Sequence, residues 1–110
     1  MISLSGAQRR YLRAAAHRLH PVVLVGEAGL TDAVLNEAER ALESHELIKI
    51  RIAAATHETR ARWLEAACER LSAAPVQHIG KTLVLYRPAK EPRLTLPAET
   101  KPAARKRLPR

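Results

Sequence analysis

The chain has 110 residues, a hydrophobic fraction of 46% and a formal net charge of +8 at pH 7. A chain of this length makes a single domain, and the positive charge favours polyanionic partners such as nucleic acid. Cys68 is the one cysteine, which excludes an internal disulfide, and the sequence has neither a signal-peptide pattern nor a run of about 18 apolar residues. We therefore expect a soluble cytoplasmic protein.

The first predicted element is a helix from Ser5 to about His17. Ser5 and Gln8 have capping-box spacing, and Pro21 ends the segment because the residue before a proline avoids the helical region. The apolar face is expected to hold Ala7, Tyr11 and Ala14 or Ala15. The wetter sides are then left to three arginines: Arg9, Arg10 and Arg13.

A short apolar run follows over residues 21–25 and predicts a strand that is covered on both faces or lies centrally in a sheet. Residues 26–29 must then form a turn. A second helix is expected from Thr31 or Asp32 to about Ser44, because apolar residues recur there at spacings of three and four. Its outer face is acidic.

The remaining predicted elements are a strand, a helix and a hairpin. Residues 47–52 alternate, which directs Ile48, Ile50 and Ile52 to the core and leaves the opposite face to Lys49 and Arg51. A third helix fits residues 57–72, with buried positions expected at Ala61, Leu64, Ala67 or Cys68, and Leu71, beside Trp63. Residues 76–79 and 82–86 are typical of two strands joined by a tight turn at Gly80-Lys81.

The residues after Tyr86 are rich in proline and charge. From residue 87 onward the sequence has eight Lys/Arg against two Glu, a composition that cannot offset its ordering entropy by burial. We therefore expect a folded domain over residues 1–88 and a disordered basic tail over 89–110. The order helix-strand-helix-strand-helix-strand-strand predicts a two-layer α/β fold in which a four-stranded mixed sheet packs with helices.

The loop Gly26-Glu27-Ala28-Gly29 is the first candidate binding site. Glycines let the backbone approach a phosphate closely, and the free amides at the start of the following helix favour an anion. In KH modules a GxxG loop clamps single-stranded RNA by its backbone. A purely structural turn explains the two glycines equally well, and the charge of Glu27 opposes phosphate binding.

Basic side chains form the second set of candidates, because each phosphate that they neutralise releases counterions and raises affinity at low salt. They are Arg9, Arg10 and Arg13 in the first helix, Lys49 and Arg51 in the alternating strand, Lys81 in the hairpin turn, Arg87 after the last strand, and Arg105-Lys106-Arg107 in the tail. For each of them the alternative is a solvated side chain that contacts no ligand.

The sequence predicts no catalytic residue, no metal and no cofactor. Its five histidines are scattered, and none pairs with Cys68 or with another histidine at a spacing typical of a metal site. No nucleophile and base can be paired either. Cys68 is expected to be a small core residue and Trp63 a packing residue.

An ordered series of matches over about residues 3 to 88 resembles the CRM family, whose name refers to chloroplast RNA splicing and ribosome maturation. The bacterial single-domain members are the YhbY-type proteins. The segments that carry the resemblance are Leu4-Ser5, Pro21 to Gly26, Gly29-Leu30-Thr31, His45 to Lys49 and Ile79 to Pro88.

The resemblance implies a fold like the C-terminal domain of translation initiation factor three, a KH-like GxxG loop in the RNA-binding surface, and association with precursors of the large ribosomal subunit. The expected protein is then a non-enzymatic, monomeric ribosome biogenesis factor that contacts the RNA backbone, with no membrane and no small-molecule substrate. Two alternatives stay open: a DNA-binding chromatin-type protein of related fold, and a protein-interaction adaptor that uses the acidic second helix.

Overall fold

A computed structural model describes residues 3–89, 94 and 96–97. Its elements follow the predicted order: α1 (Gly6–Ala16), β1 (Val23–Val25), α2 (Asp32–His45), β2 (Leu47–Ile52), α3 (His57–Leu71), β3 (Ala74–Ile79) and β4 (Thr82–Tyr86). The strand order in the sheet is β1-β2-β4-β3. Strands β1 and β2 are parallel and the other neighbouring pairs are antiparallel, so the predicted α/β fold with a mixed four-stranded sheet is confirmed.

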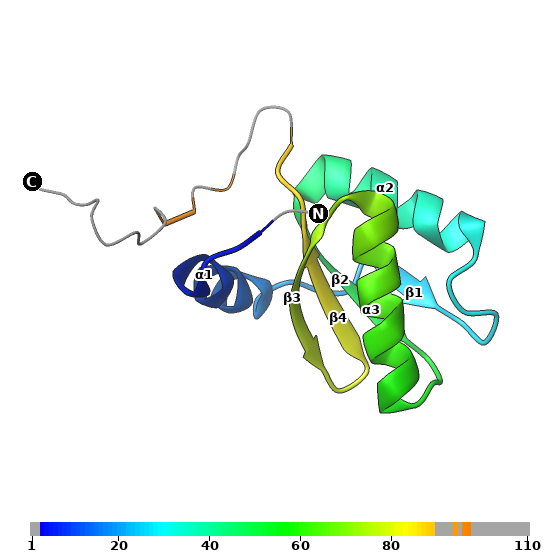
Figure 1. Cartoon of the computed structure of the whole chain (residues 1–110). Helices are drawn as coiled ribbons and strands as arrows, with labels where there is room; N and C mark the ends of the chain where they lie inside the picture. The colour runs from blue at the N-terminus through cyan, green and yellow to red at the C-terminus, as the bar shows by residue number, and fades with distance from the viewer. Residues whose placement is uncertain (1–2, 90–93, 95, 98–110) are drawn as a thin grey trace, which may run out of the picture.

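Helices α2 and α3 cover one face of the sheet and form the main core with it (Figure 1). Ile48, Ile50 and Ile52 of β2 are all buried in this core, as their alternation predicts. Cys68 is buried there too, and Trp63 packs against the cluster from its margin. Ala61, which was expected to be buried, is exposed, because the inner side of α3 at its N-terminal end is occupied by Trp63 and Leu64 instead.

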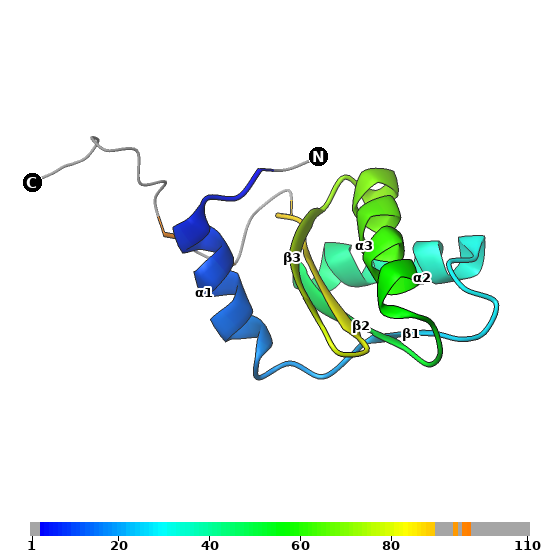
Figure 2. The same ribbon diagram turned by 60° about the horizontal axis from the view of Figure 1, so that its bottom comes forward.

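Helix α1 lies on the opposite face of the sheet (Figure 2). The capping box at Ser5 forms as predicted, but the expected apolar face is wrong: Tyr11 is 40% exposed, whereas Leu12 is fully buried. Leu12 and Ala16, four residues apart, fill a second apolar cluster together with residues from three strands: Leu47, Val76, Val84 and Tyr86. Leucine buries more apolar surface than alanine, and Leu12 fills the space above the sheet. The buried face of α1 is therefore shifted by about one residue from the predicted face.

Strand β1 lies at an edge of the sheet, so the prediction of a central or doubly covered strand is wrong. Val23 and Val25 are buried against α2 and α3, but Leu24 between them is 62% exposed. The reason is that α1 packs against β2, β3 and β4 and leaves β1 uncovered on this side of the sheet. A continuous apolar run has no alternation that could reveal this.

The described part of the chain after β4 packs on the second cluster through its leucines. We call its described residues, 87–89, 94 and 96–97, the strap. Leu94 and Leu96 pack against the Leu12 cluster, the amides of Ala89 and Leu94 each donate to the buried carboxylate of Glu46 at 2.9 Å, and the Gln8 side chain donates to the carbonyl of Pro97. Within the expected tail, residues 89, 94, 96 and 97 therefore make specific contacts, because Glu46 accepts from two of their amides and the leucines cover an apolar surface. The rest of the expected tail, including Arg105-Lys106-Arg107, lies outside the described residues.

Candidate nucleic-acid interface

The GxxG loop and the hairpin turn lie at the same end of the sheet. Because β1 is parallel to β2, the loop that follows Val25 starts beside Ile52, its partner in the register. The amide of Ile52 in turn donates to the carbonyl of Lys81 at 2.8 Å. The two candidate sites that the sequence placed in loops are thus brought together by the strand pairing.

Within the GxxG loop, the two glycines have different roles. Gly29 is buried with φ +79°, and a Cβ atom there would lie 3.1 Å from Cζ2 of Trp63. Its amide donates to the carbonyl of Gly26 at 3.1 Å. Gly26 has open space around it, and it is exposed together with Glu27 and Ala28. The structural explanation therefore accounts for Gly29, and the accessible part of the loop is Gly26 to Ala28.

The α2 helix begins directly behind this loop. Thr31 is its N-cap, and the Thr31 hydroxyl accepts from the amide of Val34 at 3.2 Å. Asp32 occupies the first turn, where its negative charge already interacts favourably with the positive end of the helix dipole. Glu27 and Asp32 together make the loop less favourable for an anion than a neutral GxxG loop would be.

Arg13 of α1 and Lys49 of β2 line a common groove between the helix and the sheet. The groove has a volume of about 480 Å³ and is lined by Arg13, Ala14, His17, Lys49, Gln77 and Ile79. None of these lining residues is acidic. Lys49 is held in place because its Nζ donates to the carbonyl of Leu19 at 3.0 Å. The sequence could not predict this pairing, which depends on how α1 crosses the sheet.

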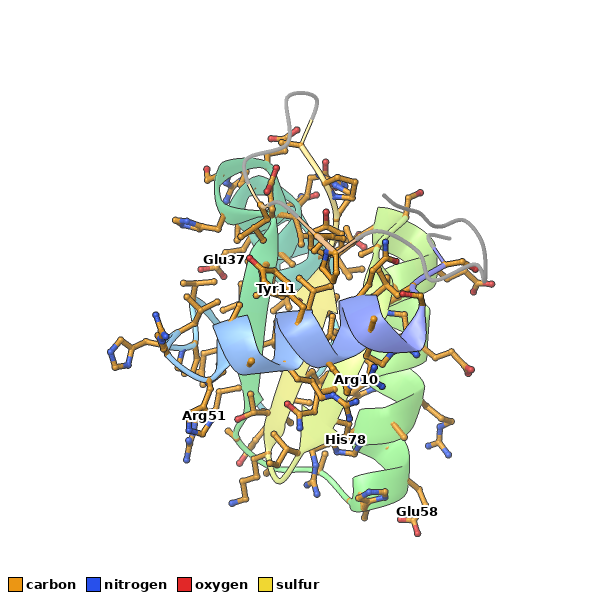
Figure 3. All side chains as sticks on the ribbon, turned by 90° about the vertical axis from the view of Figure 1, so that its left-hand side faces the viewer. Arg10, Tyr11, Glu37, Arg51, Glu58 and His78 are labelled. Carbon is orange, nitrogen blue, oxygen red and sulfur yellow. The ribbon has the colours of Figure 1, made fainter. Side chains whose placement is uncertain are left out.

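The other predicted cations lie around the same face. Arg51 is exposed two residues after Lys49, on the same face of β2, and Lys81 is exposed at the hairpin turn. Figure 3 shows Arg10 on the side of α1 that borders the uncovered part of the sheet, and Tyr11 on the other side of the helix. Arg9 and Arg13, four residues apart, follow the same side of α1.

Arg87 is an exception among the predicted cations. Its side chain is only 19% exposed and pairs with Glu39 of α2 at 2.9 Å, and Nη1 also donates to the carbonyl of Leu71 at 2.9 Å. The hydrogen bonds and charge of Arg87 lower the pKa of Glu39, and those of Glu39 raise the pKa of Arg87. Arg87 is therefore held by an ion pair and a hydrogen bond on the face of the sheet that α2 and α3 cover, away from the groove.

Two histidines stack beside the hairpin turn, and an arginine donates a hydrogen bond to one of them. The His57 and His78 rings lie 4.5 Å apart at an interplanar angle of 25°, and Nε of Arg60 donates to Nε2 of His78 at 3.3 Å. Partial burial, and then the nearby His57 and Arg60, lower the pKa of His78. A neutral imidazole that accepts from Arg60 fits this arrangement, so the cluster ties α3 to β3.

The part of the chain that the structure describes gives little support for a metal site or a nucleophilic cysteine. Residues 3–89, 94 and 96–97 contain no group of three or more His, Cys, Asp or Glu side chains that could hold a metal ion. Burial raises the pKa of the Cys68 thiol to about 12, so this thiol is poorly suited to act as a nucleophile. No helix among the described residues is long and apolar enough to cross a membrane.

Several residues of this face were not among the candidates predicted from the sequence: His17, Leu24, Gln77, Ile79 and Thr82. All but His17 lie on strands, at positions that share one face with Lys49 and Arg51 according to the register. Alternation within residues 76–79 and 82–86 could have pointed to three of them once the hairpin was assigned. Nothing in the apolar run over residues 21–25 marks Leu24 as exposed.

Comparison with known proteins gives consistent matches. The model of the CRS1/YhbY (CRM) domain family matches residues 4–87. The chain is 47% identical to an RNA-binding protein of Haemophilus influenzae, over 88% of this chain and 98% of that protein. It is 39% identical to a protein of Pseudomonas aeruginosa named as a probable RNA-binding protein, over 86% and 91% of the two chains.

A solved structure shows the same fold. The solution structure of a hypothetical Staphylococcus aureus protein, described as a candidate RNA-binding protein, superposes with a TM-score of 0.77 at 31% identity. The match covers 86% of this chain and all of the other.

Proposed function

The chain belongs to the CRS1/YhbY (CRM) domain family, and from this premise we propose that it binds RNA through the face of the sheet that carries α1. The proposed ligand is the RNA of large-subunit precursors, and the proposed role is a cytoplasmic, non-enzymatic one in ribosome assembly. The protein acts as a monomer and needs no cofactor.

One observation carries the proposal: Arg13 and Lys49, from two separate elements, line a groove that has no acidic side chain. Arg51 and Lys81 extend the positive charge toward the end of the sheet that holds the GxxG loop. Cations arranged in this way bind phosphates and give a steep dependence of affinity on salt. They position an RNA backbone without reading its sequence.

The accessible part of the GxxG loop supports the same ligand. Gly26, Glu27 and Ala28 are exposed, so a sugar-phosphate backbone can approach the main chain there as it does in KH modules. The carboxylate of Glu27 limits side-chain contacts to phosphate, and the loop therefore contributes through its backbone. The names of the bacterial relatives add support for RNA as the ligand.

Sedimentation of a bacterial lysate on sucrose gradients tests the proposal. The protein is followed by immunoblotting across free, precursor and mature subunit fractions, at low and moderate salt. The full chain is compared with a chain that ends at Pro97, which keeps the strap, and with the triple variant Arg9→Gln, Arg10→Gln, Arg13→Gln. We expect co-sedimentation with large-subunit precursors for the full and truncated chains, and its loss for the triple variant.

The two alternatives give different results in this experiment. An adaptor that binds proteins through α2 would keep its sedimentation when the three arginines are replaced. After DNase treatment of the lysate, a DNA-binding protein would stay near the top of the gradient, and in solution it would prefer duplex DNA to structured RNA at matched salt. Either result would overturn the assignment to ribosome assembly.

A further inference from the structure

The uncovered part of the sheet presents one residue from each strand in a straight line. The register places Leu24 beside Arg51, Arg51 beside Thr82, and Thr82 beside Ile79. We call these four residues the sheet row. Leu24 is 62% exposed and Ile79 57% exposed, Arg51 is exposed and Thr82 is half-buried. Two apolar side chains therefore flank a guanidinium and a hydroxyl on an open surface.

The sheet row is continuous with the groove beside α1. The neighbouring line of the register contains Lys49, Val84 and Gln77, and two of these residues line the groove with Arg13 and His17. Ile79 belongs to both the row and the groove lining. Figure 3 shows this surface, with Arg51 in the uncovered region beside α1. The combined site thus has cations along α1 and apolar contacts further along the strands.

This combination fits unpaired nucleotides better than a duplex. A duplex hides the faces of its bases and offers mainly phosphates and sugar hydroxyls, so Leu24 and Ile79 would have no role in binding it. Unpaired bases expose flat apolar faces, which pack on apolar side chains and stack on the plane of an arginine guanidinium. The phosphates that join such bases need cations alongside, and Arg13 and Lys49 are placed to provide them.

We propose that the sheet row and the groove together bind a short single-stranded RNA segment, with its bases over Leu24, Arg51 and Ile79 and its phosphates along Arg13 and Lys49. The inference rests on the proposed function, since it names the kind of RNA that the same face recognises. A four-stranded sheet of this width accommodates about two or three bases.

Binding of labelled RNA by the full chain, followed by fluorescence anisotropy, tests the proposal. The two probes are an unpaired 12-mer and a hairpin of the same composition with a short closed loop. The wild-type chain is expected to bind the 12-mer more tightly. The double variant Leu24→Ala, Ile79→Ala is expected to lose about tenfold in affinity for the 12-mer, because two apolar contacts are reduced, and to keep its affinity for the hairpin.

A second variant, Arg51→Lys, separates stacking from charge. Lysine keeps the positive charge but has no planar group, so affinity for the 12-mer falls while the slope of log affinity against log salt stays the same. Tyr11→Ala is the matched control, since it removes an exposed apolar side chain on the other side of α1. Every replaced side chain is exposed, and thermal melting checks that each variant folds.

The results distinguish this inference from the proposed function. If the double variant and Arg51→Lys keep full affinity for the 12-mer, or lose as much for the hairpin as for the 12-mer, the single-strand site is overturned. Co-sedimentation with large-subunit precursors can still hold in that case. If the full chain binds neither probe and no precursor, both proposals fail.

Discussion

The guanidinium of Arg87 makes two parallel hydrogen bonds to the carboxylate of Glu39, from Nη1 to Oε1 at 2.9 Å and from Nη2 to Oε2 at 3.0 Å. The same Nη1 donates to the carbonyl of Leu71 near the end of α3. Arg87 follows the last residue of β4, so this one side chain joins the sheet to both helices of the main core. Two-pronged pairing of this kind is the strong form of an arginine-carboxylate contact.

Replacing Arg87 by methionine should therefore lower stability without affecting RNA binding. We expect Arg87→Met to reduce the free energy of unfolding by about 1–2 kcal/mol, since Glu39 and the Leu71 carbonyl lose their donor. Urea denaturation measures the change, and Arg62→Met, at an exposed position on α3, serves as control. A reduced salt dependence of RNA affinity in Arg87→Met would contradict this assignment.

The same pair predicts a pH dependence of stability. The pKa of Glu39 is lowered from its usual 4.5, first by its hydrogen bond with Arg87. A carboxyl with a lowered pKa contributes stability above pH 4.5, and this contribution is lost as the pH falls through the lowered value. The stability difference between wild type and Arg87→Met should therefore shrink in acid, as measured by urea denaturation from pH 7 to pH 3. A difference that grows as the pH falls would be inconsistent with the pair.

The two glycines of the GxxG loop should respond differently to alanine. Gly29→Ala forces a side chain into φ +79° and against Trp63, so we expect a loss of about 1–3 kcal/mol in unfolding free energy. Gly26→Ala meets open space and should leave the melting temperature nearly unchanged. If the loop contacts the RNA backbone, Gly26→Ala weakens RNA binding although the fold is intact. Equal losses of stability in the two variants would contradict the assigned roles.

The arginines of α1 should control the salt dependence of RNA binding. Replacing Arg9, Arg10 and Arg13 by glutamine removes up to three phosphate contacts, which should lower the slope of log affinity against log salt by about 2. The matched control is Arg40→Gln, Arg62→Gln, Arg70→Gln, which changes the net charge equally at exposed positions of α2 and α3. Similar slopes for the two triple variants would show that only total charge matters.

Two truncations of the chain should differ in stability, because only one of them removes the strap. A chain that ends at residue 88 loses Leu94 and Leu96 from the second cluster and the two amides that donate to Glu46. We expect its free energy of unfolding to fall by about 2 kcal/mol or more. A chain that ends at Pro97 keeps these contacts and should unfold as the full chain does. Identical unfolding of both chains would mean that the strap adds no stability.

The sequence by itself determined the local structure and the family. Helix caps, the alternation over residues 47–52 and the Gly80-Lys81 turn depend on neighbours in the chain, and each was predicted and is found. The sequence also carries the family resemblance, because the motifs follow one another in order and at similar spacing over most of the chain. Arg51 is exposed for the same local reason, because a charged residue between apolar ones in a strand faces away from the core.

Only the tertiary structure decided which of these residues meet. The side of α1 that faces the sheet depends on the shape of the site that Leu12 fills, and the exposure of Leu24 depends on how far α1 extends across the strands. The partner of Arg87 lies 48 residues away in the sequence, and the sheet row joins residues from four strands. Contacts at such separations follow from packing and strand pairing, which no local pattern encodes.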